Sequence, residues 1–436
     1  MRRRQFVIGG AALAGAMASA ARAAPYGLRE AAREAWLYTL PLNEIALVRG
    51  RTLGLGARPN MFIRQPALAG PDSRNVTTPN NDTIYALAFI DLSKGPATVT
   101  QPDIGDRYAS FAFMDMWSDN FAVLGTRTTG AKGGTFILVG PNDAAPPGAL
   151  RSPTPWVWAL ARVVVNGDGD LPAARVVQNG YKLSGAALGA PPAPGAKCDG
   201  PWQDYFRAVS RLLLENPPPA TDGAILARIA PLGLGAGFDP TRFTNAEQGE
   251  IAAGVADAIA LARTVGLGAE QRNGWLFQAA DSGQFFQDYV GRAGVALGGL
   301  AALPPAEAMY LAALAPDGRR LFEGDRAYRL HFTRDKLPPV DAFWSLTMYE
   351  ATPEGQFFLT RNPLNRYAIG DRTSGLKYGA DGSLILWVSR TDPGGARTSN
   401  WLPAPAKGPY ALFLRLYLPK TAALGGGWTP PRMETV

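Results

Sequence analysis

The spacing of apolar residues changes along the chain and marks out its parts. Residues 26–49 carry apolar and alanine residues at helical spacing, with Gly50 as a stop and Pro41 as a point where the helix should kink or split. Residues 83–140 and the run WVWALARVVV at 156–165 are instead short aromatic or β-branched segments between Gly, Pro and Asp turns. The sequence therefore predicts a helix followed by a region of strands.

A helical pattern returns in the middle of the chain and then gives way to strands again. After the linker-like string PPAPGAKCDGP, residues 202–300 contain four segments with an apolar face at helical spacing. From residue 327 onward the runs alternate or are apolar, and the Asp-Gly pair in YGADGS favours a tight hairpin. The predicted fold class is α+β, mostly β, with two antiparallel β-sandwich-like domains and an intervening helical segment.

Composition supports several domains rich in turns. A chain of 436 residues is long enough for two or three domains, and its 50 Gly and 37 Pro favour a loop-rich fold over a helical bundle. With 47% hydrophobic and 18% charged residues it is globular in character. The expected divisions are a signal peptide at 1–24, a β-rich domain at 25–195, a helical segment at 196–310 and a β domain at 311–436.

The N-terminus has the features of an export signal. RRRQFV places paired arginines before an Ala/Gly-rich apolar core, and ARAAP offers small residues for cleavage near Ala23 or Ala24. The twin arginines and the weak apolar core favour the twin-arginine route to the periplasm or outside the cell. A membrane anchor is the alternative, but the apolar stretch of about 15 residues is shorter than the roughly 20 that a spanning helix needs. No later segment is long and apolar enough to span a bilayer.

Charge and cysteine content exclude some classes of function. Without the four arginines of its first 23 residues, the formal charge of the chain falls from +7 to +3, which gives no electrostatic case for nucleic acid. The single cysteine, Cys198, allows no intrachain disulfide. Cys198 lies in a Pro/Gly loop, and a catalytic thiol would need a base in a chain with one histidine.

The familiar catalytic motifs are absent from the sequence. It contains no G-x-S-x-G, H-E-x-x-H, G-x-x-x-x-G-K or C-x-x-C, and it indicates no haem, nucleotide or multi-histidine zinc site. The single histidine, His331, lies in the predicted strand YRLHFTRD on the same face as Arg329. It is a candidate acid/base group, or else a surface or hydrogen-bonded histidine of the sheet.

The stretch TPNNDTIYA, residues 78–86, concentrates polar side chains before an apolar strand. Asn80, Asn81 and Asp82 can close a turn by bonding their own backbone. Their oxygens beside Tyr85 also suit a hard cation or the hydroxyls of a polyol. The residue types leave both interpretations open.

A second polar group follows in FMDMWSDN. Here Asp115, Asp119 and Asn120 surround Trp117, and strand alternation would place Asp115 and Trp117 on one face with Phe111 and Phe113. A carboxylate among aromatic side chains needs a partner or a function, and the group also suits a sugar or cyclic alcohol.

Charged residues also occur near the ends of the C-terminal strands. In RYAIGDRTSGLKY, Arg366, Asp371 and Arg372 could form an internal ion-pair network or clamp a carboxylate or phosphate. SNWLPAP is a further polar-aromatic cluster. Arg415 in LFLRLYLP is a charge inside an apolar strand, so it must pair with an acid or face solvent.

These strings resemble a known pair of domain families. NVTTPNNDTIYALAFIDL and RYASFAFMDMWSDNFAVLGTRTTG resemble the exported bacterial domain of unknown function 1254. YRLHFTRDKLPPVDAFWSLTMYE, NRYAIGDRTSGLKYGADGSLILWVSR and NWLPAPAKGPYALFLRLYLPK resemble its usual C-terminal companion, domain of unknown function 1214. The resemblance covers most of the chain after the signal and implies two β domains and an envelope location, with no settled activity. It draws attention to Asn81, Asp82, Tyr85, Trp344, Asp371, Arg372, Asn400 and Trp401.

Two groups of candidate site residues result. The acid/base candidates are Asp82, Asp115 and His331. The side chains expected to bind a ligand are Asn81, Tyr85, Trp117, Trp344, Arg366, Arg372, Asn400 and Trp401. No metal ligands are assigned, and a divalent cation stays open as a cofactor.

The leading hypothesis is a periplasmic, hydrolase-like enzyme that acts on a small polar or anionic molecule through carboxylate acid/base groups. Whether the protein is an enzyme at all is left open by the sequence. The alternative is a non-catalytic envelope protein that binds carbohydrate or a protein partner. For either function the sequence leaves the oligomeric state open. An enzyme should place Asp82, Asp115 or His331 in one deep pocket, whereas a binding protein should expose its tryptophans on a shallow face. A third interpretation is that the polar motifs seal the interface between the two β domains.

Overall fold

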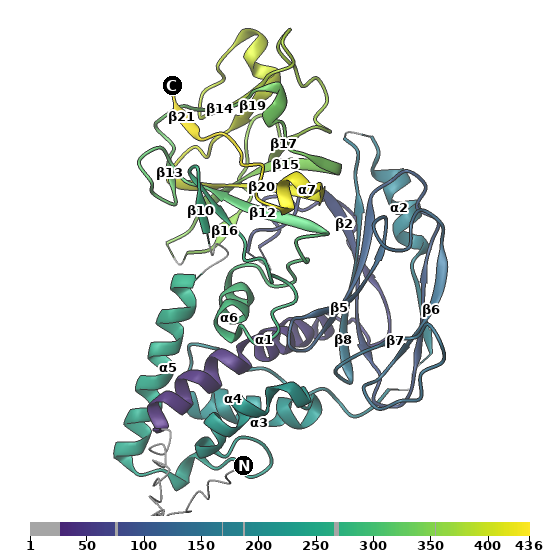
Figure 1. The fold of residues 1–436 in the computed structure, drawn as a ribbon, viewed down its shortest axis with the longest axis vertical. Coiled ribbons are helices and arrows are strands. Elements are labelled where there is room, and N and C mark those ends of the chain that lie inside the picture. Colours follow the sequence, from purple (N-terminus) through teal and green to yellow (C-terminus); the bar gives the residue numbers. More distant parts are fainter. Residues whose placement is uncertain (1–26, 75–76, 168, 186–187, 266–269, 354) are drawn as a thin grey trace, which may run out of the picture.

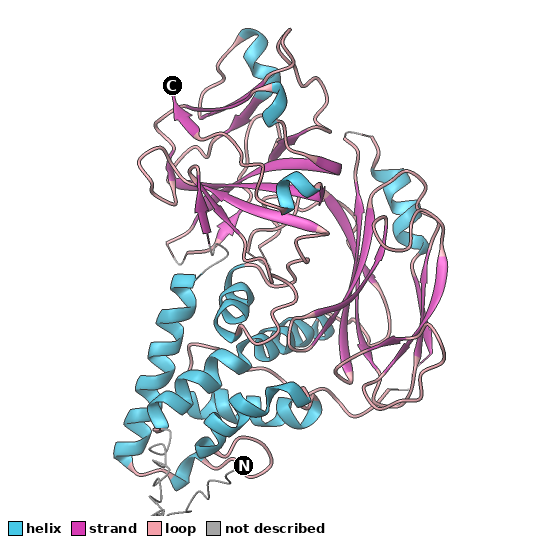
Figure 2. Cartoon of the chain, in the orientation of Figure 1, coloured by secondary structure: helices cyan, strands magenta, loops and turns pink. Residues whose placement is uncertain are grey.

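Two bodies of β-strands and one body of helices make up the structure (Figures 1 and 2). It is a computed structural model, which describes residues 27–436 apart from 75–76, 168, 186–187, 266–269 and 354. The predicted export signal lies outside the described residues. The predicted α+β class, with two mainly antiparallel β domains and helices between them in sequence, is confirmed.

The N-terminal β body is a sandwich of two sheets. Its five-stranded sheet has the order β1-β2-β8-β4-β5, and its four-stranded sheet has the order β7-β6-β3-β9. Ile84 and Phe111 of the first sheet pack against Val99 and Leu138 of the second. The strands are β1 (Ile63–Arg64), β2 (Thr83–Asp91), β3 (Ala97–Gln101), β4 (Ala109–Asp115), β5 (Asn120–Gly125), β6 (Gly134–Val139), β7 (Leu150–Arg151), β8 (Trp156–Val164) and β9 (Lys182–Gly185).

The second face of the five-stranded sheet is covered by helices. Phe89, Met114 and Trp158 on this face share a core with the helices, which explains why β4 and β8 are buried along their whole length. A short helix that the sequence did not predict, α2 (Leu171–Gly180), packs on β2 and β8 from the opposite face, where Ala174 joins the core of the sandwich. The helices of the helical body are α1 (Leu28–Gly54), α3 (Trp202–Glu215), α4 (Gly223–Ile229), α5 (Asn245–Val265) and α6 (Tyr289–Gly298), with the 3-10 turns η1 (Ala220–Asp222), η2 (Ala230–Leu232) and η3 (Pro240–Arg242).

Helix α1 packs with α3 to α6 rather than within the N-terminal sandwich (Figure 1). The predicted break at Pro41 does not divide it, and the helix continues past Gly50 to Gly54. A proline removes one backbone hydrogen bond, and the flanking Leu40 and Leu42 are fully buried, so packing compensates for that loss. The helical body therefore combines the start of the chain with its middle.

The C-terminal β body also has two sheets. The larger has the path β10-β11-β12-β20-β15-β16, with β13 beside β20 and β17 beside β15, and the smaller has the order β19-β18-β14-β21. β10 and β11 come from the segment expected to be helical. The elements are β10 (Glu270–Arg272), β11 (Trp275–Phe277), β12 (Ala308–Ala313), β13 (Phe322–Glu323), β14 (Tyr328–Phe332), η4 (Arg334–Lys336), β15 (Val340–Ala351), β16 (Phe357–Phe358), β17 (Ala368–Gly370), β18 (Leu384–Ser389), η5 (Gly395–Asn400), β19 (Trp401–Pro403), β20 (Pro409–Pro419), α7 (Thr421–Leu424) and β21 (Met433–Thr435).

The two β bodies meet through an aromatic cluster. Tyr108 of the N-terminal body packs edge-on against Phe343 and Tyr417 of the C-terminal body, with ring centroids 5.5 and 5.4 Å apart. The loop before β2 lies along the same boundary, where Asn80 donates to the Tyr417 hydroxyl. Among the helices of the described residues, none is long and apolar enough to cross a membrane.

Candidate functional site

A cavity of about 390 Å³ lies where the two β bodies meet the loop after α6. Strand alternation explains its N-terminal wall, because Tyr85 and Leu87 of β2 point to the same side as Leu160 and Arg162 of the paired strand β8. Phe413 contributes from β20 across the boundary. The cavity is therefore lined by both domains, and it combines apolar side chains with polar ones such as Gln65, Thr78 and Asn80.

Two buried arginines, one from each β body, line this cavity, which we name the two-arginine cavity. Arg162 of β8 is 4% exposed and Arg415 of β20 is 5% exposed. Arg162 donates from Nη2 to the Ala301 carbonyl at 2.8 Å, and its Nη1 has no hydrogen-bond partner among the described residues. Arg415 donates from Nη1 to the Thr347 hydroxyl at 2.9 Å.

Neither arginine forms an ion pair with a carboxylate in the described part of the chain. Asp82 acts on Arg415 only at longer range and has its own arginine partner. Asp72 also lines the cavity but is exposed and binds Arg361. An arginine side chain does not lose its proton in proteins, so the cavity wall carries two buried positive charges that no acid of the described residues matches.

The fields of both guanidinium groups reach one hydroxyl in the cavity. Burial raises the pKa of Tyr310, and the charges of Arg162 and Arg415 both act against that rise. The Tyr85 ring centroid lies 5.3 Å from the Arg162 guanidinium carbon. An anionic group beside Tyr310 would thus interact with both arginines.

The stretch TPNNDTIYA forms the partition between this cavity and a second one of about 530 Å³. Thr78 and Asn80 line the two-arginine cavity, whereas Asn81 and Asp82 line the second, which we name the Asp82 cavity. The Asn80 side-chain oxygen accepts from the backbone N–H groups of Asp82 and Thr83 at 2.6 and 3.2 Å. The predicted turn is confirmed, and its residues also line cavities.

Asp82 is engaged across the domain boundary. One carboxylate oxygen accepts from Arg372 at 2.5 Å and the other from the Ser345 hydroxyl at 2.7 Å. Arg372 also donates to the Val165 carbonyl at 2.6 Å. Because both oxygens of Asp82 are held by protein donors, the contacts favour the interpretation in which this motif seals the interface.

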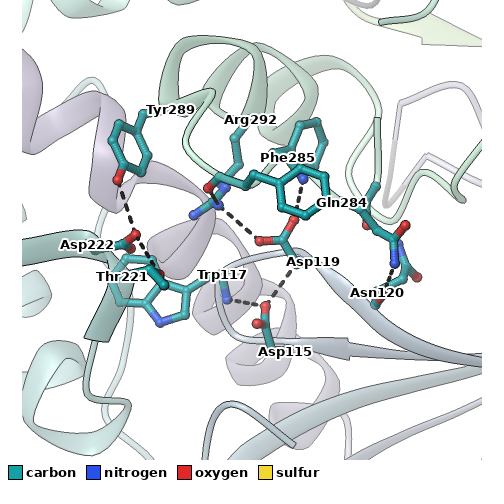
Figure 3. Close-up of polar contacts among 12 residues, drawn as sticks. Asp115, Trp117, Asp119, Asn120, Thr221, Asp222, Gln284, Phe285, Tyr289 and Arg292 are labelled. Carbon is teal, nitrogen blue, oxygen red and sulfur yellow. Dashed lines mark hydrogen bonds and ion pairs between the residues drawn. The ribbon is translucent and has the colours of Figure 1, made fainter. Parts of the chain in front are cut away.

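A third cavity, of about 500 Å³, contains Asp115 and is named the Asp115 cavity (Figure 3). Asp115 accepts backbone N–H bonds from Trp117 and Asp119 at 2.9 and 3.0 Å. Asp119 in turn pairs with Arg292 at 3.0 Å. Burial, with the charge of Asp119 next in size, raises the pKa of Asp115 to about 7. Asp222 completes the acidic wall.

An Asp115→Asn variant should remove a pH dependence of stability. The folded-state pKa of about 7 exceeds that of an unfolded aspartate, about 3.9. Between these values the folded protein holds a proton that the unfolded chain has lost, so the free energy of unfolding falls as pH rises. Urea denaturation across this window should show wild type losing stability relative to the variant. A difference that stays constant with pH would contradict the expectation.

The predicted acid/base candidates are not brought together. Asp82 lies at the domain boundary and Asp115 in a separate cavity, while His331 lies on β14 of the smaller C-terminal sheet, opposite Ile385. His331 lines none of the three cavities. Within the described ranges, no group of three or more His, Cys, Asp or Glu side chains could hold a metal ion.

The three tryptophans predicted to bind a ligand are buried, whereas a binding protein is expected to expose them on a shallow face. Trp117, Trp344 and Trp401 are 0, 3 and 3% exposed. Trp117 does not share the face of Phe111, because β4 ends at Asp115 and the chain turns. It stacks instead on Tyr38 of α1, with centroids 4.7 Å apart.

The remaining predicted ligand-binding residues hold loops or line the Asp82 cavity. Arg366 donates to the carbonyls of Thr398, Ser399 and Trp401 around η5. Asn400 bridges the Lys377 and Ile385 backbones at 2.7 and 2.9 Å. Asn81 donates to the Ala69 carbonyl at 2.6 Å. Of all the predicted binding residues, Tyr85 lines the two-arginine cavity, and Asn81, Arg366 and Arg372 line the Asp82 cavity.

Sequence reasoning missed Arg162, Tyr310 and Arg292. A signal existed for Arg162, since it interrupts the apolar strand WVWALARVVV as Arg415 interrupts LFLRLYLP. The expectation that Arg415 pairs with an acid or faces solvent is wrong, because it is buried and forms no ion pair with the described residues.

Family comparisons match the two β bodies separately. A model described as "Protein of unknown function (DUF1254)" matches residues 59–185, and one described as "Protein of unknown function (DUF1214)" matches residues 307–421. No curated protein sequence matches the chain.

Similar solved structures come from two bacteria. The VPA0106 protein from Vibrio parahaemolyticus is 22% identical, with a TM-score of 0.69 over 94% of this chain and 100% of its own, which shows the same fold. An uncharacterised protein from Burkholderia cenocepacia, 16% identical over 92% of this chain and 88% of its own, has a TM-score of 0.43, too low to support an argument.

Proposed function

The chain belongs to the family that joins a DUF1254 domain to a DUF1214 domain, and we propose that it binds a small organic anion in the two-arginine cavity. One observation carries the proposal. Arg162 and Arg415, contributed by different domains, are both buried in one cavity wall without an ion-pair partner among the described residues.

The energetic argument rests on the cost of a buried charge. Moving a guanidinium group out of water costs roughly several kcal/mol of solvation free energy. A counter-charge and hydrogen bonds can offset this cost. Arg415 recovers part of this cost from Thr347, but the Nη1 of Arg162 recovers none. An anionic ligand would supply the missing counter-charge to both groups.

The remaining walls favour an anion that carries an apolar body. Leu87, Trp158, Leu160 and Phe413 give the cavity an apolar surface beside its polar groups. Its volume of about 390 Å³ suits a compact molecule. A carboxylate matches the planar fork of arginine, so we propose an aromatic or short aliphatic carboxylic acid as the ligand class.

We propose that the two-arginine cavity binds its ligand and does not hydrolyse it. Among the described residues that line this cavity, Asp72 is the only acid, and it is exposed and paired with Arg361. The described part of the cavity wall therefore offers no buried carboxylate as an acid/base group. Export to the periplasm through the twin-arginine route remains part of the proposal and rests on the sequence RRRQFV and the residues after it.

Calorimetric titration with benzoate and hexanoate tests the ligand class, with benzamide and benzyl alcohol as uncharged counterparts. We expect the acids to bind and the uncharged compounds to bind much more weakly. In Arg162→Gln the affinity should fall by about 10-fold or more, because a hydrogen bond to a charged group contributes about 1.5–3 kcal/mol. Arg329→Gln, which alters an exposed arginine paired with Glu434, is the matched control.

Two results would overturn the proposal. One is that benzamide binds as tightly as benzoate, since the arginines would then not favour charged over uncharged ligands. The other is that Arg162→Gln and Arg329→Gln both retain the affinity of the wild type.

A further inference from the structure

The Asp115 cavity has a charge opposite to that of the two-arginine cavity. Three aspartates line it, Asp115, Asp119 and Asp222, against the single arginine Arg292. Asp115 and Asp119 come from the end of β4 and the turn after it, Asp222 from η1 and Arg292 from α6 (Figure 3). The N-terminal sheet and the helical body therefore both contribute to its walls.

Two of the three aspartates are fully engaged within the protein. Asp222 accepts hydroxyl hydrogen bonds from Tyr38 and Tyr289 at 2.8 and 3.1 Å. Asp119 accepts from the Phe285 N–H at 2.6 Å and pairs with Arg292. Asp115 differs, because its two backbone bonds both go to Oδ1, and Oδ2 accepts none from the described residues.

Buried polar groups beside the acids also lack partners. Arg292 is 2% exposed and uses only Nη2, which donates to Asp119 and the Phe286 carbonyl, so Nε and Nη1 have no partner among the described residues. Asn120 is 1% exposed, and its Oδ1 is likewise unpaired. Figure 3 shows the Arg292 guanidinium group between Asp222 and Asp119. Unpaired buried donors and acceptors are rare in folded proteins and call for an explanation.

We propose that the Asp115 cavity binds a small primary ammonium compound that carries a hydroxyl or carboxylate oxygen next to the amine. The ammonium group would donate to Asp115 Oδ2 and Asn120 Oδ1, two acceptors in the cavity wall that have no hydrogen-bond donor among the described residues. Its neighbouring oxygen would accept from the free nitrogens of Arg292. The excess of acids over arginine in the wall favours a positively charged group, and Arg292 explains why an oxygen must accompany it.

Titration of the intact wild-type protein with three small probes tests this site first. L-Serine and ethanolamine carry the ammonium group, and lactate has a hydroxyl and a carboxylate without it. We expect L-serine or ethanolamine to bind and lactate not to bind. Preference for L-serine would show that Arg292 selects a carboxylate, and preference for ethanolamine that a hydroxyl suffices. Lactate binding as tightly as L-serine, or no binding by either amine at millimolar concentration, overturns the proposal.

A matched pair of variants assigns the binding to the cavity. Asp115→Asn keeps the side-chain oxygen that closes its turn but removes the charge, and we expect amine affinity to fall at least 10-fold. Asp103→Asn makes the same change in an exposed turn, where Asp103 accepts from Gly105, and should leave affinity unchanged. Equal affinity in both variants would contradict the assignment. Arg162→Gln should not affect amine binding, so this proposal and that of the two-arginine cavity fail independently.

Discussion

An Asp82→Ala variant is expected to lose roughly 3–5 kcal/mol of unfolding free energy, the usual cost of removing one partner from a buried ion pair. Asp82 is 2% exposed and holds Arg372 and the Ser345 hydroxyl of the C-terminal domain from the start of β2. Its loss leaves a charge and a hydroxyl without their partner at the domain boundary. Urea or thermal denaturation of the wild type and variant measures the difference.

Asp72→Ala provides the matched control, because it also breaks an ion pair between the two domains. The pair of Asp72 with Arg361 has side-chain exposures of 85 and 76%, so its removal should cost about 0–1 kcal/mol. If Asp82→Ala is no more destabilising than Asp72→Ala, then the Asp82 contacts do not seal the interface.

The local part of the Asp82 motif could be predicted from sequence, but its partners could not. Short polar side chains after a proline indicate a turn, and Asn80 forms it as expected. The partners Ser345 and Arg372 lie 263 and 290 residues further along the chain. No pattern within a window of the sequence carries that information, since it depends on how the two β domains dock.

The arginines of the two-arginine cavity could be predicted from the sequence, but the cavity itself could not. A charge within an apolar strand marked Arg415 as unusual, and the same reasoning applied to WVWALARVVV would have found Arg162. In the structure, the register of β2 and β8 then pairs Tyr85 with Arg162. What strand alternation cannot give is the presence of a cavity there, because that requires the positions of β20 and the loop after α6.

The wrong prediction for the face of Trp117 has a different cause. Alternation holds only while the strand continues, and β4 ends two residues earlier, at Asp115. The chain then turns, with Ser118 at a φ of 67°, and the tryptophan packs against α1. The docking of α1 on this face is another long-range contact, which explains why an expected ligand-binding residue is part of a core.

The two-arginine cavity leads to a second large expected effect, in which stability and binding change in opposite directions. Arg162→Met should raise the unfolding free energy of the ligand-free protein by about 1–4 kcal/mol, the range found when buried ion pairs give way to apolar side chains of similar volume. The variant loses one hydrogen bond, to the Ala301 carbonyl, and removes an unpaired buried donor. The same change should abolish the stabilisation that benzoate gives to the wild type.

Denaturation with and without benzoate separates this expectation from a structural role of Arg162. A residue kept for stability would make Arg162→Met less stable in both conditions, and that result would contradict an anion site. Arg49→Met is the matched control, because Arg49 is equally buried, at 1% exposed, but is paired with Glu215 at 2.7 Å. Its replacement should destabilise the protein, since Glu215 loses its partner, while leaving the effect of benzoate intact. If Arg162→Met stabilises the protein and Arg49→Met destabilises it, then the missing counter-charge of Arg162, and not its burial alone, explains its effect on stability.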